Sequence, residues 1–299
     1  MDKHSKNKQL MNKKIFFHIK TLEVVVFFLL FNTMTVLAQK DPVIIDTTYF
    51  KCEYKTLYYT DTLKFKDAIW MGDEFILEVG SKVSKFYSKS TDAYERVRSD
   101  PEANAAYQKS LKMPPEAGRG NRPARHSTLV IYNNFPKGKR TIHDAIFFDY
   151  YIFEDDNLPQ QWTIIADSAK TILEYTCHKA TCSYRGRNYE AWYAIDLPVN
   201  AGPWKFSGLP GLIMSVQDTK GHYTFEIKGL MKAKEHIEYI EYPIRKYSHT
   251  DRKTFLRTNA KSLQIGLVRY LEANSPQSGN SDFKQSGGGA KYDLLERDY

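Results

Sequence analysis

The stretch Gly202–Asp218, GPWKFSGLPGLIMSVQD, decides the fold of this chain, because it sets glycines and prolines between large apolar side chains. A turn is predicted at its first two residues. After that turn, Trp204 and Phe206 are predicted to share one face of a short strand, with Lys205 on the opposite face. The two aromatic rings should therefore be buried against a sheet.

A second turn is predicted at Pro210-Gly211, which fits the central positions of a type II turn. Proline presets the first φ, and glycine accepts the positive φ that follows. Burial of each large apolar side chain beside these turns contributes roughly 1.5–3 kcal/mol. A structural role therefore accounts for the whole motif, which comprises Gly202, Pro203, Gly208, Leu209, Pro210, Gly211, Leu212 and Ile213. The alternative is that the motif lines a binding groove.

Strand signals recur at short spacing along the rest of the chain. Arg185-Gly186-Arg187-Asn188 predicts the turn of a long hairpin between residues 171–184 and 189–197. Because Gly, Asn and Asp turns join so many short strands, the sequence predicts a large antiparallel sheet. The other predicted strands cover residues 42–61, 74–79, 83–87, 128–132, 145–154, 161–166, 212–217, 222–228 and 237–242.

Helical spacing of apolar residues predicts two helical regions. One covers residues 91–111, with Thr91 or Asp92 as the cap and Pro101 opening its second part, and the other covers residues 251–272. The predicted fold class is therefore α+β: a large, curved antiparallel sheet with one or two helices packed on it.

The first 38 residues are predicted to be a signal peptide. Six lysines precede or flank an eight-residue apolar run, Val24–Phe31, and small residues end at Ala38. A membrane anchor is the alternative, but the run is far shorter than the roughly 20 residues that span a bilayer. We therefore expect a periplasmic or secreted protein with no lipidation cysteine and no transmembrane segment after cleavage. Residues 39–273 are predicted to form a single β-rich domain, and residues 274–299 a flexible Gly/Ser-rich linker and short tail.

The net charge depends strongly on this leader. The full 299-residue chain carries +8, and removing the six lysines and two acids of the leader lowers the charge to +4. Nucleic acid is therefore not expected as a partner. A basic run from Arg119 to Arg140 could contact an anionic lipid or glycan surface, or it could be a surface loop.

The motif at Gly208–Ile213, GLPGLI, resembles the string that names the GLPGLI family of exported proteins, which occurs mainly in Bacteroidota and has no determined function. The resemblance extends over residues 175–206, with a cysteine-bearing strand, an Arg-Gly-Arg turn, Ala-Trp-Tyr and Gly-Pro-Trp-Lys-Phe. The family often ends in a Tyr-Asn-Pro-Ile-Glu-like string, where this chain has Lys291–Glu296. The succession of strands also resembles the lipoprotein-carrier half-barrels in pattern.

Cys177 and Cys182 are the only close pair among three cysteines. On one extended strand they would lie about 16 Å apart, whereas a disulfide needs Cα atoms within roughly 7 Å. A disulfide is therefore possible only if the four residues between them form a turn. Together with His178 the two thiols could hold zinc, but further ligands are lacking, so no metal and no cofactor is predicted.

The function expected from these features is non-enzymatic binding. A concave, aromatic-lined sheet would hold an apolar ligand or dock an envelope protein, with Trp192, Trp204 and Phe206 as the contacts. Arg185 and Arg187, which flank the glycine of a predicted hairpin tip, could fork onto a carboxylate or phosphate. The alternative for these arginines is an ordinary solvated turn.

Two other classes of function stay open. The chain contains no recognisable catalytic motif, but a hydrolase could use scattered groups such as His143, Asp144, Asp149 and His222. A purely structural assembly module is the second alternative. A cavity in the folded protein would favour the binding class.

Overall fold

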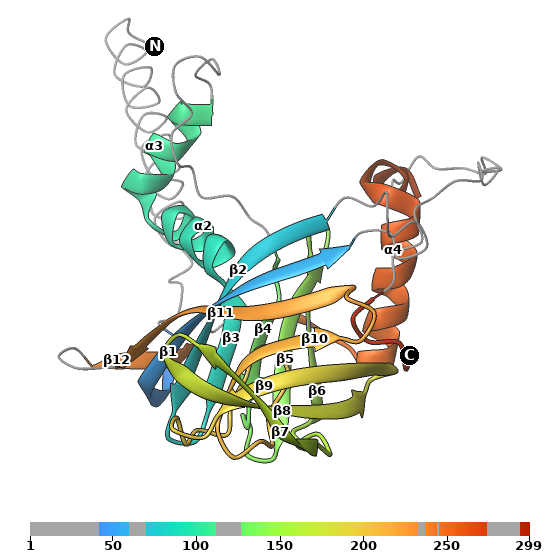
Figure 1. Ribbon diagram of the computed structural model, residues 1–299. Helices are drawn as coiled ribbons and strands as arrows, with labels where there is room; N and C mark the ends of the chain where they lie inside the picture. Colours follow the sequence, from blue (N-terminus) through green and yellow to red (C-terminus); the bar gives the residue numbers. More distant parts are fainter. Residues whose placement is uncertain (1–41, 60–69, 112–126, 233–236, 244, 274–293) are drawn as a thin grey trace, which may run out of the picture. The chain divides into compact units, whose positions relative to one another are not determined.

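The computed structural model describes residues 42–59, 70–111, 127–232, 237–243, 245–273 and 294–299 (Figure 1). Its main feature is one sheet of 13 strands in the order β13-β6-β5-β4-β3-β2-β1-β11-β10-β9-β8-β7, with β12 paired to β1. The strands are β1 (Val43–Tyr59), β2 (Trp70–Gly80), β3 (Ser84–Ser88), β4 (Val130–Asn133), β5 (Lys139–Ile146), β6 (Asp149–Asp156), β7 (Thr163–Ile172), β8 (Tyr175–Tyr184), β9 (Arg187–Ala194), β10 (Leu212–Asp218), β11 (Tyr223–Lys232), β12 (Glu238–Tyr242) and β13 (Ser248–His249).

This sheet confirms the predicted α+β class. The strand pairs along its length are antiparallel, apart from the short parallel pair of β13 with β6. The sheet is curved (Figure 1) and open, and β13 and β7 are the two ends of its strand order. The long central β1 pairs with β2 on one side and β11 on the other, so it joins the N-terminal strands to the later ones.

Three helices accompany the sheet in the described ranges: α2 (Lys89–Ser99), α3 (Pro101–Leu111) and α4 (Arg252–Ala273). The first two confirm the helical region predicted to divide at Pro101. The predicted cap was wrong, because Ser88 caps α2 and its side chain accepts a hydrogen bond from the Thr91 amide. Helix α4 packs on the sheet through Phe255, whose ring lies 5.0 Å from that of Phe153.

Two predicted strands are each divided by a turn. Residues 145–154 contain the end of β5 and most of β6, and residues 171–184 contain the end of β7 and all of β8. Phe147 and the pair Leu173-Glu174 turn the chain with positive φ, which large side chains seldom adopt. Neither turn contains the Gly, Asn or Pro that would have marked it in the sequence, so the prediction missed both.

The burial predicted for the motif at residues 202–213 is confirmed. Trp204, Phe206, Leu212 and Ile213 are at most 3% exposed, and the Phe206 ring lies 4.8 Å from that of Tyr189. The predicted short strand at residues 204–206 is wrong, since these residues form a turn and Trp204 has φ 55°.

The predicted type II turn at Pro210-Gly211 is also wrong. Gly208, rather than Gly211, carries the positive φ, at 96°. Gly211 is needed for a different reason, because a Cβ atom there would lie 2.0 Å from the carbonyl oxygen of Ala194 on β9. The second glycine of the motif therefore sets the backbone direction, and the third allows close packing against the neighbouring strand.

Residues Ile44–Tyr299 belong to one compact unit. Of the predicted linker and tail, residues 274–293 lie outside the described residues, and Leu294–Tyr299, called the tail below, pack against the core. The predicted signal peptide also lies outside the described residues. Within the part of the chain that the structure covers, no helix combines the length and apolar character that a membrane crossing requires.

Candidate functional site

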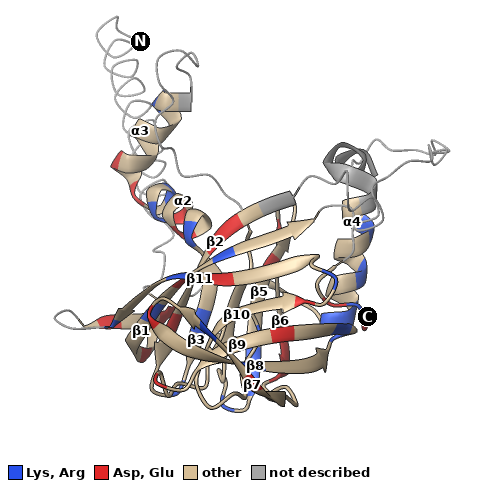
Figure 2. Cartoon of the chain, in the orientation of Figure 1, with Lys and Arg blue, Asp and Glu red and all other residues tan. Residues whose placement is uncertain are grey.

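Four cationic side chains contact the tail, and together they are called the cradle: Arg185, Arg187, Lys205 and Arg252. Figure 2 shows Lys and Arg positions in blue near the C-terminus. Arg187 is the most deeply placed, with a side chain that is 1% exposed. It donates to the Asp218 carboxylate over 2.8 Å and to the carbonyl oxygens of Leu294 and Leu295 over 2.8 and 3.0 Å. One guanidinium group thus neutralises a buried acid and holds the backbone of the tail.

Lys205 lies beside Arg187 in the cradle with a side chain that is 2% exposed. Its ammonium group is 2.6 Å from a carboxylate oxygen of Glu296 and 3.2 Å from one of Asp155. A buried lysine without such partners would incur a large desolvation cost. The Glu296 carboxylate is therefore an internal counter-ion that stabilises the charged lysine.

Arg185 and Arg252 hold the outer part of the tail. Both donate to the Asp298 carboxylate, over 3.0 and 2.8 Å, and Arg185 also contacts both carboxylate oxygens of Asp155. Burial alone would raise the pKa values of Asp155 and Asp298. The adjacent cations outweigh this effect and lower both pKa values, so both acids are charged at neutral pH.

The hairpin tip between β8 and β9 is shaped to receive the tail. The Arg297 amide donates to the Arg185 carbonyl over 2.9 Å. At Gly186, where φ is 78°, a Cβ atom would lie only 2.8 Å from Cβ of Arg297. The glycine therefore serves both the turn and the close approach of the tail.

These contacts answer the prediction that Arg185 and Arg187 bind an anion. They do bind carboxylates, but those carboxylates belong to this chain: Asp155, Asp218 and Asp298. The solvated-turn alternative is wrong for Arg187, which is buried. Sequence reasoning missed Lys205 and the tail acids; the one available signal was a lysine between two aromatic residues in a motif predicted to be buried.

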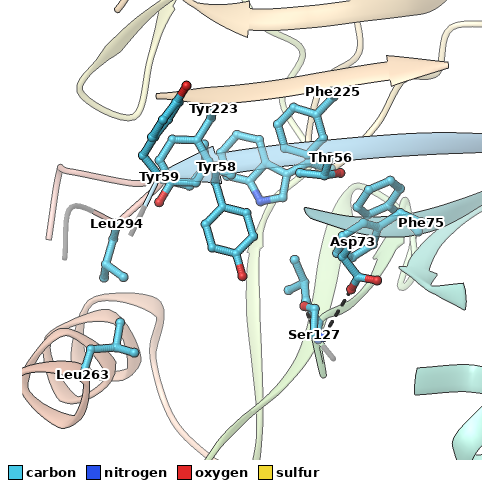
Figure 3. Close-up of a pocket in the computed structure, with 14 residues that line it drawn as sticks. Thr56, Tyr58, Tyr59, Asp73, Phe75, Ser127, Tyr223, Phe225, Leu263 and Leu294 are labelled. Atoms are coloured by element: carbon cyan, nitrogen blue, oxygen red, sulfur yellow. Dashed lines mark hydrogen bonds between the residues drawn. The ribbon is translucent and has the colours of Figure 1, made fainter. Parts of the chain in front are cut away.

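An apolar pocket of about 450 Å³ lies next to the cradle (Figure 3). Its walls come from β1, β2, β11, α4 and the tail, and Leu263 and Leu294 lie across from Phe75 (Figure 3). Aromatic and leucine side chains dominate the lining: Tyr58, Tyr59, Phe75, Phe86, Leu129, Trp204, Tyr223, Phe225, Leu263, Leu294 and Leu295. Such a lining suits an apolar ligand in the size range typical of small-molecule sites.

Three polar residues interrupt this apolar lining: Thr56, Asp73 and Ser127. An Asp73 carboxylate oxygen accepts a hydrogen bond from the Ser127 amide over 3.2 Å (Figure 3). Thr56, its cross-strand neighbour on β1, is 5% exposed, and its hydroxyl oxygen has no hydrogen-bond partner within the described ranges. A buried hydroxyl left unpaired is costly, and a polar group on a ligand would relieve that cost.

The three aromatic residues predicted as ligand contacts have different positions. Trp204 lines the apolar pocket. Phe206 lies behind it, with ring centroids 5.1 Å apart, and lines a second, more polar hollow of about 370 Å³. Trp192 is half-buried on β9, where the Lys170 ammonium lies 4.4 Å from its ring, and it is absent from the pocket lining. Of the three predicted contacts, Trp204 alone is therefore placed to contact a ligand in the apolar pocket.

The structure contradicts the possible disulfide. Strand β8 runs without a turn through Cys177 and Cys182, and both thiols are free and buried. Burial raises the pKa of the Cys182 thiol to about 12, and that of Cys52 likewise to about 12. These thiols are therefore protonated at neutral pH, and over the described residues no three His, Cys, Asp or Glu side chains converge as a metal site requires.

The candidate hydrolase residues are distributed over separate clusters. His143 is buried against Tyr242, with its Nε2 atom 3.2 Å from the tyrosine hydroxyl, and burial lowers its pKa to about 3. His222 instead lies beside Asp218 in the cradle region, 3.9 Å from its carboxylate. Asp144 accepts a hydrogen bond from Thr128, and Asp149 is exposed at the start of β6. The two histidines therefore do not form one catalytic group.

Of the basic run from Arg119 to Arg140, the structure describes only residues 127–140. Arg140 is fully buried and donates to Asn133, Asn157 and the Lys205 carbonyl, so it is a structural residue rather than part of a basic surface. The run up to residue 126 lies outside the described residues.

Comparison with known proteins identifies a family segment but no activity. Residues 183–215 match the family model Porph_ging, described as a protein of unknown function. This segment contains three of the four cradle cations, Arg185, Arg187 and Lys205, together with Trp204 of the pocket. No curated protein matches the chain.

Two solved structures resemble this chain, the structure of PNGF-II in the P21 space group and the same protein in the C2 space group. Each is 14% identical, with a TM-score of 0.47, and the match covers 72% of this chain. The matched region spans about a third of those chains, 34% and 33% respectively.

Proposed function

We propose that this protein is a non-enzymatic binding protein that holds an apolar ligand in the pocket between β1, β2, β11, α4 and the tail. The observation that carries the proposal is the pocket itself, a hollow of about 450 Å³ lined mainly by aromatic and leucine side chains. The resemblance to the exported GLPGLI family and the signal-peptide pattern support a place in the periplasm or outside the cell.

The polar residues of the pocket refine the ligand class. The Thr56 hydroxyl is buried and without a partner in the described structure, beside the Asp73 carboxylate on the neighbouring strand. A ligand with an apolar body and one hydroxyl or carbonyl group would satisfy this hydroxyl while its body contacts the rings. We therefore expect long-chain alcohols or similar amphipathic molecules to bind better than plain hydrocarbons of the same size.

A fluorescence titration tests the proposal. The apolar dye N-phenyl-1-naphthylamine should bind saturably to the full chain, with energy transfer from tryptophan, and long-chain alcohols should displace it. Leu129→Trp, which adds a bulky side chain to the pocket lining, should abolish dye binding. Leu158→Trp is the matched control, because Leu158 is 67% exposed and absent from the pocket lining. Saturable binding that survives Leu129→Trp would place the dye elsewhere and reject the proposed site.

A further inference from the structure

The tail belongs to the cradle and to the pocket at the same time. Arg187 holds the carbonyl oxygens of Leu294 and Leu295, while the side chains of the same two leucines line the pocket. The next residue, Glu296, is joined to Lys205 and Arg252, each over 2.6 Å. A single six-residue segment therefore carries both the ionic contacts and part of the apolar wall.

We propose that the tail is a ligand-contacting wall of the binding site, and that its docking in the cradle is coupled to occupancy of the pocket. This inference rests on the proposed function. A ligand in the pocket gains apolar contacts with Leu294 and Leu295 only while the tail is docked. Binding therefore stabilises the docked tail, and by thermodynamic linkage docking of the tail raises ligand affinity by the same factor. A cradle weakened enough to undock the tail therefore lowers ligand affinity.

The position of the charges explains why this wall is separable from the sheet. In the docked tail, the Arg297 amide donates to the Arg185 carbonyl, and the Arg187 guanidinium donates to two tail carbonyl oxygens. Glu296 and Asp298 add ion pairs. No strand pairing joins the tail to the sheet in the described residues. Charge–charge contacts at Asp298, whose side chain is 37% exposed, weaken with salt, whereas the pairing of β1 with its neighbours does not depend on charge.

The acidic end of the tail is complementary in charge to the cradle. Glu296 and Asp298 are two residues apart, and each contacts Arg252. Glu296 also contacts Lys205 over 2.6 Å, and Asp298 also contacts Arg185 over 3.0 Å. The cradle thus recognises a segment of the form Leu-Leu-Glu-x-Asp. When Glu296 and Asp298 are bound in the cradle, Leu294 and Leu295 form part of the pocket wall.

Hydrogen exchange on the full chain tests the coupling. Exchange of the amides at residues 294–299 is followed by mass spectrometry with and without saturating N-phenyl-1-naphthylamine, with β7 as an internal reference far along the sheet order. We expect the dye to slow exchange of the tail by about fivefold or more, within the usual range of coupling between sites. Exchange in β7 should be unchanged.

Two variants separate the possible outcomes. Asp298→Asn should speed tail exchange and weaken dye affinity severalfold, whereas Asp156→Asn, at an exposed acid paired with Lys139, should change neither. Leu294→Ala keeps every cradle charge and should lower dye affinity through the lost contact alone. Dye binding with unchanged or faster tail exchange would overturn the coupling and leave the pocket intact; absence of saturable binding would overturn both proposals.

Discussion

The cradle and the apolar pocket lie side by side and share the tail, but they differ in whether their buried polar groups have partners. In the cradle, Arg187 and Lys205 are almost completely buried, and each is paired with carboxylates of the same chain. In the pocket, aromatic walls surround a threonine hydroxyl without a partner in the described structure. The cradle is completed by the protein itself, and the unpartnered hydroxyl in the pocket supports our proposal that a ligand completes the pocket.

The largest expected effect comes from breaking the cradle at its centre. Arg187→Met removes the guanidinium that donates to the Asp218 carboxylate and to two tail carbonyl oxygens. Removal of one partner from a buried ion pair costs about 3–5 kcal/mol. Urea denaturation should therefore show a loss of this size in the free energy of unfolding. The control is Lys220→Met, at an exposed lysine in the turn between β10 and β11. An equal loss of stability in both variants would contradict the importance of the cradle.

The next largest effect is a difference in stability between alanine substitutions at two glycines, which separates the tail contact from backbone strain. Gly186 and Gly138 have nearly equal φ, 78° and 80°, but a Cβ atom would meet Arg297 at Gly186 and nothing within 4 Å at Gly138. Gly138→Ala should cost about 1–2 kcal/mol, the strain of a left-handed alanine. Gly186→Ala should cost at least about 1 kcal/mol more because it displaces the tail. Equal losses in thermal or urea unfolding would show that the tail contributes nothing at this position.

Two threonines of β1 test whether the unpartnered hydroxyl in the pocket contributes to ligand binding. Thr56 and Thr48 are both buried with unpartnered hydroxyls in the described structure, but only Thr56 lines the pocket. Thr56→Val should lower affinity for a long-chain alcohol about tenfold, near 1.4 kcal/mol, with little loss of stability. Thr48→Val should leave affinity unchanged. An equal effect of both variants in the dye-displacement titration would remove Thr56 from the proposed site.

The smallest expected effect is a dependence of tail docking on pH. The lowered pKa of Asp298 means that its stabilising contribution is fully present above the ordinary value of 3.8 and is lost as the pH falls through the lowered value. Because Asp298 is partly exposed, the contribution should be below about 1 kcal/mol. The difference in unfolding free energy between the unmodified chain and Asp298→Asn should be constant from pH 7 to 5 and shrink below pH 3.8. A difference that vanishes near neutral pH would contradict this assignment.

The predictable part of the fold was the part marked by local chemistry. Turns with Gly and Asp were found at Gly186 and at Asp218–Gly221, and the hairpins around them are confirmed. Turns at Phe147 and at Leu173-Glu174 were missed, because the pairing of β5 with β6 and of β7 with β8 closes two-residue turns there at positive φ, against the preference of these residues. Burial of Trp204, Phe206, Leu212 and Ile213 was predicted correctly, although the turn geometry beside them was not.

The candidate site was less predictable because it is assembled from distant segments. Arg185 and Arg187 were singled out for binding carboxylates, which they do, but nothing in local spacing indicated Asp218 or the tail as the source. The pocket combines β1, β2, β11, α4 and the tail, and only Trp204 among its residues was predicted to contact a ligand. Local patterns specify turns and faces, whereas a pocket depends on the order of strands in the sheet.

The long sequence separation within the cradle has a consequence for synthesis. Arg187 precedes its acceptor Leu294 by 107 residues, and Lys205 precedes Glu296 by 91. At a typical elongation rate, roughly 5–20 s pass between the emergence of the arginine from the ribosome and that of the segment that receives its hydrogen bonds. During this interval Lys205 can already pair with Asp155, and Arg187 with Asp218, but neither cation can yet contact the tail. The contact of Lys205 with Glu296 can therefore form only after these 91 further residues have been added.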